Sequence, residues 1–221
     1  MFISQIFSRF KNLNILVEID PDLLESLDCE DKVSTERTIQ INLYKLIYAM
    51  GTIQSRRFAP SNRQKYLDKM DLIEKIYSNT EDFKIKIDET RSSCGSEILT
   101  TMSEDFGVGI SVVIAMTLYN IQESTIQKIY GSDKRPDWKC QTTDNRILIV
   151  ESKGSTSMAT SRRQQTNALI QKNRRNGDIK VASLTVLNEN NISTNRFLDP
   201  PIVPDNRVIP HKWVKSETDL I

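Results

Sequence analysis

Three charged side chains stand at the ends of two stretches that have the composition of β-strands. Asp137 comes directly before the stretch 138–143, while Glu151 and Lys153 end the stretch 146–153. Because side chains alternate across a strand, Glu151 and Lys153 share a face, where the apolar pattern predicts burial. A buried charge is costly unless it is paired or binds a metal. Two carboxylates and an ammonium around one point suit metal-assisted hydrolysis of a phosphodiester.

The oxygen ligands of this group indicate a hard divalent cation. Magnesium keeps several waters and is typically held by one or two carboxylates together with substrate phosphate. Asp137 and Glu151 would supply the carboxylates, and the backbone carbonyl of Ser152 is a further candidate ligand. Lys153 is the candidate group for orienting or deprotonating the metal-bound water. The chemistry needs no histidine, and the chain contains only one.

A predicted β-hairpin brings these residues together. The stretch 138–143 is strand-like, Asp144-Asn145 is a favourable turn pair, and the stretch 146–150 is a compact apolar run rich in branched residues. If the two strands pair, Asp137 at the start of the first strand is level with Glu151 at the end of the second. Their carboxylates can then reach the same point.

Further elements are predicted on both sides of the hairpin. Ser103 can cap a helix that runs to about Tyr119, in which Gly107 and Gly109 permit close packing. A short strand is expected over 126–130. A helix over 157–173 and a buried strand over 179–187 follow the hairpin. The predicted order is helix, three strands, helix, strand.

Pro136-Asp137 followed by Glu151-Ser152-Lys153 resembles the signature of the PD-(D/E)xK nuclease superfamily. The resemblance covers roughly residues 103–187 and implies an α/β fold with a restriction-endonuclease-like αβββαβ core and a mixed central sheet. It also implies two further site residues. Glu104 matches an acidic residue on the first core helix, although an acid in a first helical turn is also stabilised by the helix dipole alone. Gln164 matches a residue on the helix after the strand, with Gln165 as the alternative.

Basic residues are concentrated around these elements. Residues 134–180 contain eleven basic and four acidic side chains, whereas the whole chain has a net charge of +1. Concentrated positive charge is typical of a surface that contacts phosphates, and a solvated helix face is the other interpretation. The candidate nucleic-acid-binding residues are Arg162, Arg163, Lys172, Arg174 and Arg175.

The first part of the chain, residues 1–95, is predicted to be a mainly helical region. A short strand around 15–19 precedes amphipathic helices over 34–54 and 63–77. Between 78 and 96 only Phe83, Ile85 and Ile87 alternate like a strand, and this polar stretch is the candidate boundary. The nuclease-like core with an irregular C-terminal tail then occupies residues 96–221.

Composition narrows the protein class. The chain has 221 residues with 38% hydrophobic and 27% charged side chains, which fits one folded domain, with or without a small helical addition. The longest apolar stretch, 110–118, is too short for a membrane span, and the N-terminus has no export signal. Three widely spaced cysteines predict neither a disulfide framework nor a zinc site. We therefore expect a cytoplasmic protein without a membrane partner.

The expected function is hydrolysis of DNA phosphodiester bonds with Mg²⁺, or with Mn²⁺ in its place, by an endonuclease acting in restriction, repair or defence against foreign DNA. The resemblance alone implies this setting, and it also implies assembly as a homodimer or with a partner protein. Both are analogies, because one fold can host several functions. RNA is an alternative substrate, because the metal and the charged residues act on the phosphate whichever sugar is present. A module that binds nucleic acid or assembles with other proteins without cleaving is the alternative from another class.

Overall fold

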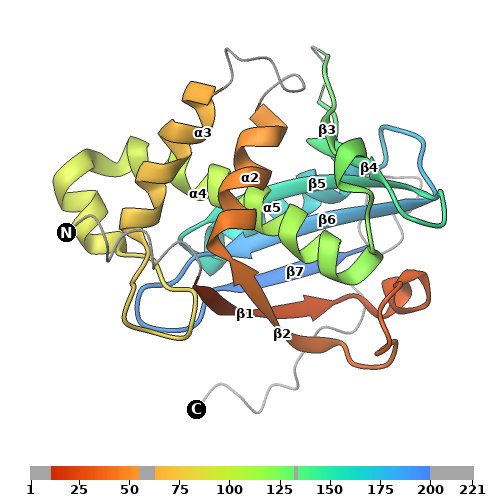
Figure 1. Cartoon of the computed structure of the whole chain (residues 1–221), viewed down its shortest axis with the longest axis horizontal. Helices are drawn as coiled ribbons and strands as arrows, with labels where there is room; N and C mark the ends of the chain where they lie inside the picture. The colour runs from red at the N-terminus through yellow and green to blue at the C-terminus, as the bar shows by residue number, and fades with distance from the viewer. Residues whose placement is uncertain (1–10, 55–62, 132–133, 200–221) are drawn as a thin grey trace.

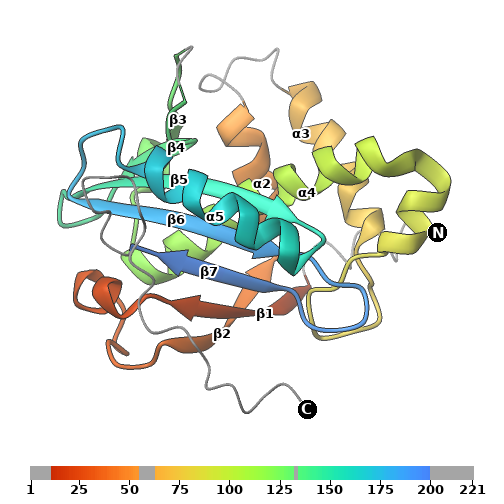
Figure 2. The same cartoon turned by 180° about the vertical axis from the view of Figure 1, so that it is seen from behind.

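A seven-stranded mixed sheet forms the centre of the molecule, with helices on both of its faces (Figures 1 and 2). The structure is a computed structural model, and it describes residues 11–54, 63–131 and 134–199. The strand order across the sheet is β2-β1-β7-β6-β5-β4-β3. The expected α/β class with a mixed central sheet is therefore confirmed.

The strands are β1 (Asn12–Ile19), β2 (Glu36–Asn42), β3 (Gln127–Lys128), β4 (Trp138–Gln141), β5 (Ile147–Ser155), β6 (Ile179–Val186) and β7 (Thr194–Leu198). The helices are α2 (Leu43–Gln54), α3 (Arg63–Met70), α4 (Ile87–Tyr119) and α5 (Met158–Lys172), with short 3-10 turns η1 (Pro21–Ser26), η3 (Asp71–Lys75) and η4 (Glu123–Thr125). From α4 to β6 the chain follows the predicted order of helix, three strands, helix and strand.

Two of the strand pairs are parallel and four are antiparallel. β5 pairs with β6, and β1 with β7, in parallel, while the remaining neighbours run antiparallel. The predicted hairpin of β4 and β5 is confirmed, and Asn145 in its turn has a left-handed φ of 69°. Asn tolerates this conformation better than most residues.

The expected helix over 34–54 is wrong in its first half. Residues of β2 pair with β1, and the helix α2 begins only at Leu43. Ile39 and Ile41 face the core with a period of two, although Ile39 also fits the helical spacing of the apolar residues that follow. Asn42 separates the two elements, because its side chain accepts the backbone N–H groups of Tyr44 and Lys45 at 3.0 and 3.2 Å. The N-terminal region thus adds two strands to the central sheet.

The first core helix also differs from the prediction. α4 begins at Ile87, continues across a kink at Gly95, where φ is 84° and ψ is 171°, and ends at Tyr119. Ser103 is a buried residue inside this helix and not its cap. The serine-rich part of α4 is exposed to solvent, so its polarity resembled that of a loop. α4 also runs across the expected boundary after residue 95.

Smaller deviations lie at the edges of the predicted elements. The helix expected over 63–77 ends at Met70 and continues as η3. The strand expected around Phe83 and Ile85 is reduced to isolated bridges. β7, which was not predicted, enters the sheet between β6 and β1. The rest of the expected irregular tail, residues 200–221, lies outside the described residues.

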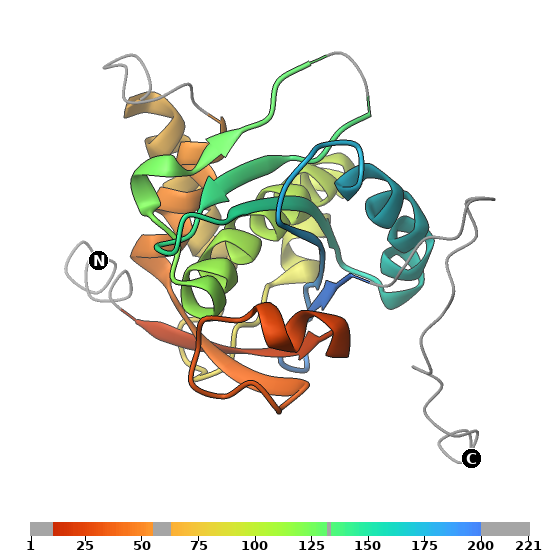
Figure 3. The same cartoon turned by 90° about the vertical axis from the view of Figure 1, so that its right-hand side faces the viewer.

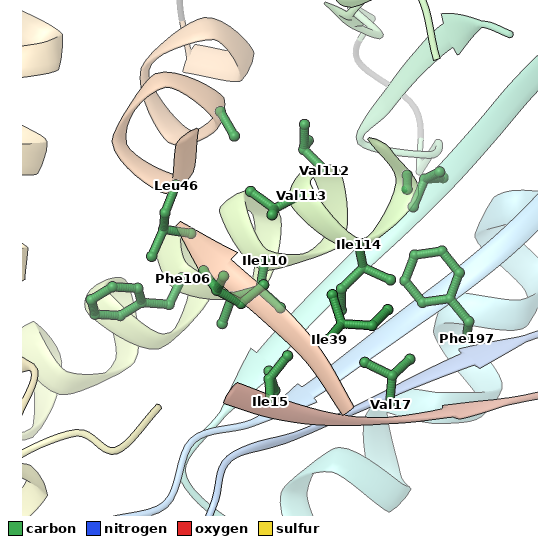
Figure 4. Packing of buried hydrophobic residues seen from close by; sticks show 14 of the residues in the cluster. Ile15, Val17, Ile39, Leu46, Phe106, Ile110, Val112, Val113, Ile114 and Phe197 are labelled. Atoms are coloured by element: carbon green, nitrogen blue, oxygen red, sulfur yellow. The ribbon is translucent and has the colours of Figure 1, made fainter. Parts of the chain in front are cut away.

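The main hydrophobic core lies between the sheet and α4. Side chains from β1 and β2, such as Ile15 and Ile39, meet Phe106, Ile110 and Ile114 of α4 (Figure 4). α2 and α3 lie on the same side of the sheet as α4, and α5 covers the opposite face (Figure 3). α4 is long and apolar enough to cross a bilayer, but 72% of its most apolar window is buried in this core. It is packed as the core helix of a soluble domain.

Candidate active site

A notch in the sheet holds the candidate site. β4 begins at Trp138, which pairs with Val150 of β5. β5 continues to Ser155, and beyond Val150 its residues pair only with β6. Because β4 begins only at Trp138, no strand covers this edge of β5 beyond Val150. The open edge lies next to Glu151 and Lys153.

Asp137 lies at this end of β4 and reaches across to β5. Its backbone N–H donates to the carbonyl of Val150 at 3.1 Å. Its Oδ2 accepts the backbone N–H of Ser152 at 2.8 Å. Extending the register by one residue places Asp137 opposite Glu151. The predicted register, with Asp137 level with Glu151, is thus present in the structure.

Glu151 is a fully buried acid with 0% exposure. Its Oε1 lies 2.5 Å from Nζ of Lys153, whose side chain is 26% exposed. Apart from the ion pair with Lys153, neither carboxylate oxygen has a hydrogen-bond partner among the described residues. A buried carboxylate with so few donors is expensive, because its desolvation is poorly compensated.

The electrostatics of the site follow from burial and crowding of like charges. Burial raises the pKa of Glu151 to about 8, and the neighbouring Asp137 adds to this shift. Burial also raises the pKa of Asp137, against the opposing effects of Lys153 and the Ser152 N–H. Burial alone would lower the pKa of Lys153, but Glu151 and the other acids outweigh it and raise the pKa. The two carboxylates share a site that a divalent cation would stabilise.

A pocket of about 290 Å³ opens at the notch, and we call it the site pocket. Its floor is formed by β5 and Asp137. α2 and α4 line one side of it, α5 lines the other side, and β3 also contributes. The lining residues are Met50, Ile53, Glu104, Asp105, Val108, Lys128, Asp137, Ser152, Lys153, Gly154 and Gln164. Glycines bring α4 close to β5 here, since a Cβ built on Gly154 would lie 1.7 Å from the carbonyl oxygen of Ser103.

Glu104 and Gln164 both line the site pocket from opposite sides of the sheet. Glu104 is exposed there, and it is 17 residues inside α4, so the dipole at a helix N-terminus does not explain it. Oε1 of Gln164 is buried without a hydrogen-bond donor in the described part of the chain. Gln165, the alternative in the sequence, is not among the pocket-lining residues.

The donor atoms fit magnesium better than a softer metal. Asp137 and Glu104 offer carboxylate oxygens in the site pocket, where Ser152 also lines the wall. Glu151 is not among the lining residues, and its carboxylate lies next to Asp137 and Lys153. Within residues 11–54, 63–131 and 134–199, no three His, Cys, Asp or Glu side chains form a compact metal-binding group. Two protein carboxylates are nevertheless sufficient for Mg²⁺, which completes its six ligands with water and phosphate.

Three parts of the site had not been singled out from the sequence. Asp105 forms an ion pair with Lys69 of α3 at 2.5 Å and closes one wall of the pocket. Lys128 of β3 lies on its rim. The third part is a buried hydrogen-bond network that joins the side chains of Ser152, Ser111 and Trp138. Only Lys128 carried a signal, as a lysine within the predicted strand 126–130.

The predicted nucleic-acid-binding residues do not form one surface. Arg162, Arg163 and Arg174 are exposed, and Arg175 is partly buried. The prediction that Lys172 contacts phosphate is wrong, because its side chain has 0% exposure and forms an ion pair with Asp199. Lys172 is the last residue of α5 and turns inward toward the sheet, where its ammonium also donates to the carbonyl of Lys180 at 3.3 Å.

Comparison with family models, curated proteins and solved structures found no match for this chain.

Proposed function

We propose that this protein is a metal-dependent nuclease that hydrolyses phosphodiester bonds of DNA and has a restriction-endonuclease-like core. The observation that carries the proposal is the fully buried Glu151, opposite Asp137 and 2.5 Å from Lys153. Asp137 and Lys153 line the site pocket, and Glu151 lies directly behind that lining. The order of elements from α4 to β6 and the position of Glu104 and Gln164 on the pocket walls support it.

Asp137 and Glu151 would hold Mg²⁺ or Mn²⁺, with Glu104 and the backbone carbonyl of Ser152 as further candidate ligands. When bound, the metal supplies a water of lowered pKa and neutralises charge on the scissile phosphate. The Ser152 N–H keeps the Asp137 carboxylate directed toward β5. Because the neighbouring acids raise its pKa, Lys153 enters the site as an ammonium, which suits orientation of the attacking water and stabilisation of the phosphate. Gln164 has an unused carbonyl oxygen with which to position that water.

The exposed arginines on and after α5 supply the expected phosphate contacts. Arg162, Arg163 and Arg174 point away from the core, and each can neutralise a backbone phosphate without reading sequence. DNA restriction, repair or defence in the cytoplasm is the proposed setting, and assembly as a homodimer or with a partner protein would let both strands be cut.

The test is cleavage of supercoiled plasmid, linear duplex, single-stranded DNA and RNA with Mg²⁺ or Mn²⁺. Asp137→Asn and Lys153→Ala are compared with two matched controls, Glu97→Gln and Lys32→Ala, which change exposed residues away from the site. We expect the wild type and the controls to cut DNA, and both site variants to lose at least about 100-fold in rate.

The alternatives give different patterns in the same experiment. Equal cleavage by the wild type and both site variants would contradict the assigned residues. Cleavage of RNA in preference to DNA would make the protein a ribonuclease with the same catalytic group. Binding of nucleic acid without cleavage under any metal condition would instead support a non-cleaving module.

A further inference from the structure

We propose that a second pocket, next to the site pocket, binds one nucleotide unit of a nucleic-acid strand through its phosphate and its base. This pocket has a volume of about 320 Å³, and we call it the basic pocket. The inference rests on the proposed function in one respect, because the strand in the basic pocket is taken to be the one whose phosphodiester lies at Asp137 and Glu151.

The basic pocket lies along one row of the sheet. Gln127 of β3 pairs with Lys139 of β4, which pairs with Ile149 of β5, and all three line the pocket. Ile149 precedes Glu151 by two residues and lies on the same face of β5, which is a distance of about 7 Å along a strand. Lys128 lines both pockets. A ligand in the basic pocket is therefore within one nucleotide step of the candidate catalytic residues.

The charges of the basic pocket favour an anionic ligand. Its lining contains Lys128, Lys139 and Arg175, and no acidic side chain among the residues that the structure describes. The ammonium groups of Lys128 and Lys139 make no hydrogen bond or ion pair within the described part of the chain, unlike Lys69, Lys153 and Lys172, whose ammonium groups are all paired. Cationic side chains that line one pocket repel one another, and a phosphate relieves that repulsion through charge-assisted hydrogen bonds.

An aromatic residue and two amides complete the lining. Tyr130 lines the pocket and is 48% exposed, and an aromatic ring accessible to solvent can stack on a base. Gln127 and Asn176 carry both donors and acceptors, which can bond to a sugar or a base edge. The volume is at the small end of ligand pockets, which span about 300–1,000 Å³. One nucleotide of a single strand therefore fits better than an intact duplex.

The experiment measures binding of a fluorescein-labelled twelve-residue oligothymidylate by anisotropy, in EDTA so that no metal is bound and no cleavage occurs. Lys139→Ala is compared with Lys32→Ala, which removes the same charge near β2 at the opposite edge of the sheet. Lys139→Ala should weaken binding by about tenfold and reduce the salt dependence of log K by about 0.7, the amount expected for one lost phosphate contact on a single strand. Tyr130→Ala should also weaken binding, and Tyr130→Phe should restore it because the ring face is retained.

Each outcome separates this inference from the proposed function. If Lys139→Ala and Tyr130→Ala bind the oligonucleotide as tightly as Lys32→Ala does, the basic pocket is not a nucleotide site, whether or not the protein cleaves DNA. If both lose affinity while Asp137→Asn binds normally and the wild type never cleaves, the nucleotide site stands and the nuclease proposal fails. If Tyr130→Phe binds as weakly as Tyr130→Ala, the stacking part of the inference is overturned.

Discussion

Ser152 holds Asp137 in place through its backbone, with its N–H 2.8 Å from Oδ2 of the carboxylate. The hydroxyl of the same residue is fixed from the other face of the sheet. It lies 2.8 Å from the hydroxyl of Ser111 on α4 and 3.0 Å from Nε1 of Trp138, and the indole N–H also contacts Ser111 at 3.1 Å. All three side chains are buried, so the network connects α4, β4 and β5 directly behind the carboxylates.

Ser111→Ala should disturb both stability and metal binding. The change leaves Ser152 and Trp138 bonded only to each other, which should lower the free energy of unfolding by about 1–3 kcal/mol. Because Ser152 anchors Asp137, Mg²⁺ affinity should fall by about tenfold, a size seen when outer-shell partners of a metal site are removed. Denaturant unfolding and calorimetric Mg²⁺ titration measure the two effects. Thr117→Ala on the exposed side of α4 is the control, and unchanged Mg²⁺ affinity in Ser111→Ala would make the network a packing feature only.

Metal binding should raise the melting temperature of the wild-type protein. At a concentration about 100 times its Kd, Mg²⁺ should stabilise the folded state by about 2.7 kcal/mol, which corresponds to about 5–11 °C for a chain of this size. Asp137→Asn and Glu151→Gln should respond much less, while Glu97→Gln should respond like the wild type. A thermal shift series with Mg²⁺, Mn²⁺ and EDTA measures this. An equal shift in all four proteins would place the metal elsewhere.

The pH dependence of stability should reveal the buried acid. The pKa of Glu151 rises from 4.5 to about 8 on folding, so the folded state favours its protonated form. This stabilising contribution is complete below pH 4.5 and is lost as the pH rises through about 8. Glu151→Gln cannot ionise, so its stability relative to the wild type should increase steadily across that window in EDTA.

Urea unfolding of both proteins between pH 5 and pH 9 tests this dependence. Glu97→Gln, which changes an exposed acid, should show a constant difference from the wild type. Added Mg²⁺ should cancel the trend, because the metal stabilises the ionised carboxylate. A constant difference between Glu151→Gln and the wild type in EDTA would mean that Glu151 ionises as easily in the folded protein as in the unfolded chain.

Gly154→Ala should be poorly tolerated. The added methyl group would meet the backbone of α4 at Ser103, and backbone atoms cannot move aside without displacing the helix. We expect a loss of about 1–3 kcal/mol in the free energy of unfolding from overpacking. Gly109→Ala is the matched comparison on α4, since its nearest neighbours are the flexible side chains of Met50 and Leu46. Similar losses in the two variants, measured by denaturant unfolding, would contradict the close contact of α4 with β5.

Lys172→Met should affect folding and leave nucleic-acid binding unchanged. The substitution keeps the apolar stem but removes the charge that is paired with Asp199, and Asp20 lies close enough to influence the same ammonium. Breaking a buried pair is strongly destabilising, and we expect a loss of up to about 3 kcal/mol because Asp199 stays partly exposed. Arg163→Ala should show the opposite pattern, with normal stability and weaker oligonucleotide binding. Reduced binding by a stably folded Lys172→Met protein would restore Lys172 to the nucleic-acid surface.

Several features of the site could be predicted from the sequence because they depend on local rules. The alternation of side chains along 147–153 and the turn at Asp144-Asn145 were sufficient to place Asp137 opposite Glu151. Ser157 and Asn173, the first and last residues of the predicted helix, are the caps of α5. The class of fold follows from the same periodicities.

Other features depended on contacts between distant segments. Nothing local distinguishes Lys172 from Arg163, and only the position of Asp199, 27 residues further along the chain, decides which side chain is buried. Ile39 fitted both a helix and a strand, and pairing of β2 with β1 settled which one formed. The serine-rich start of α4 had the polarity of a loop, and its helical structure became clear only in the folded chain.

The sequence by itself determined the charged group at the end of β5, because short-range alternation fixes which side chains share a face of a strand. The tertiary structure decided what surrounds that group. Glu104 reaches the site pocket because Gly107 and Gly154 let α4 approach β5. The packing of α5 on the opposite face places Gln164, and not Gln165, in the lining of that pocket. These placements depend on the packing of helices against the sheet, which involves residues far apart in the sequence and so is not visible in a local pattern. The same packing buries Glu151 and thereby raises its pKa.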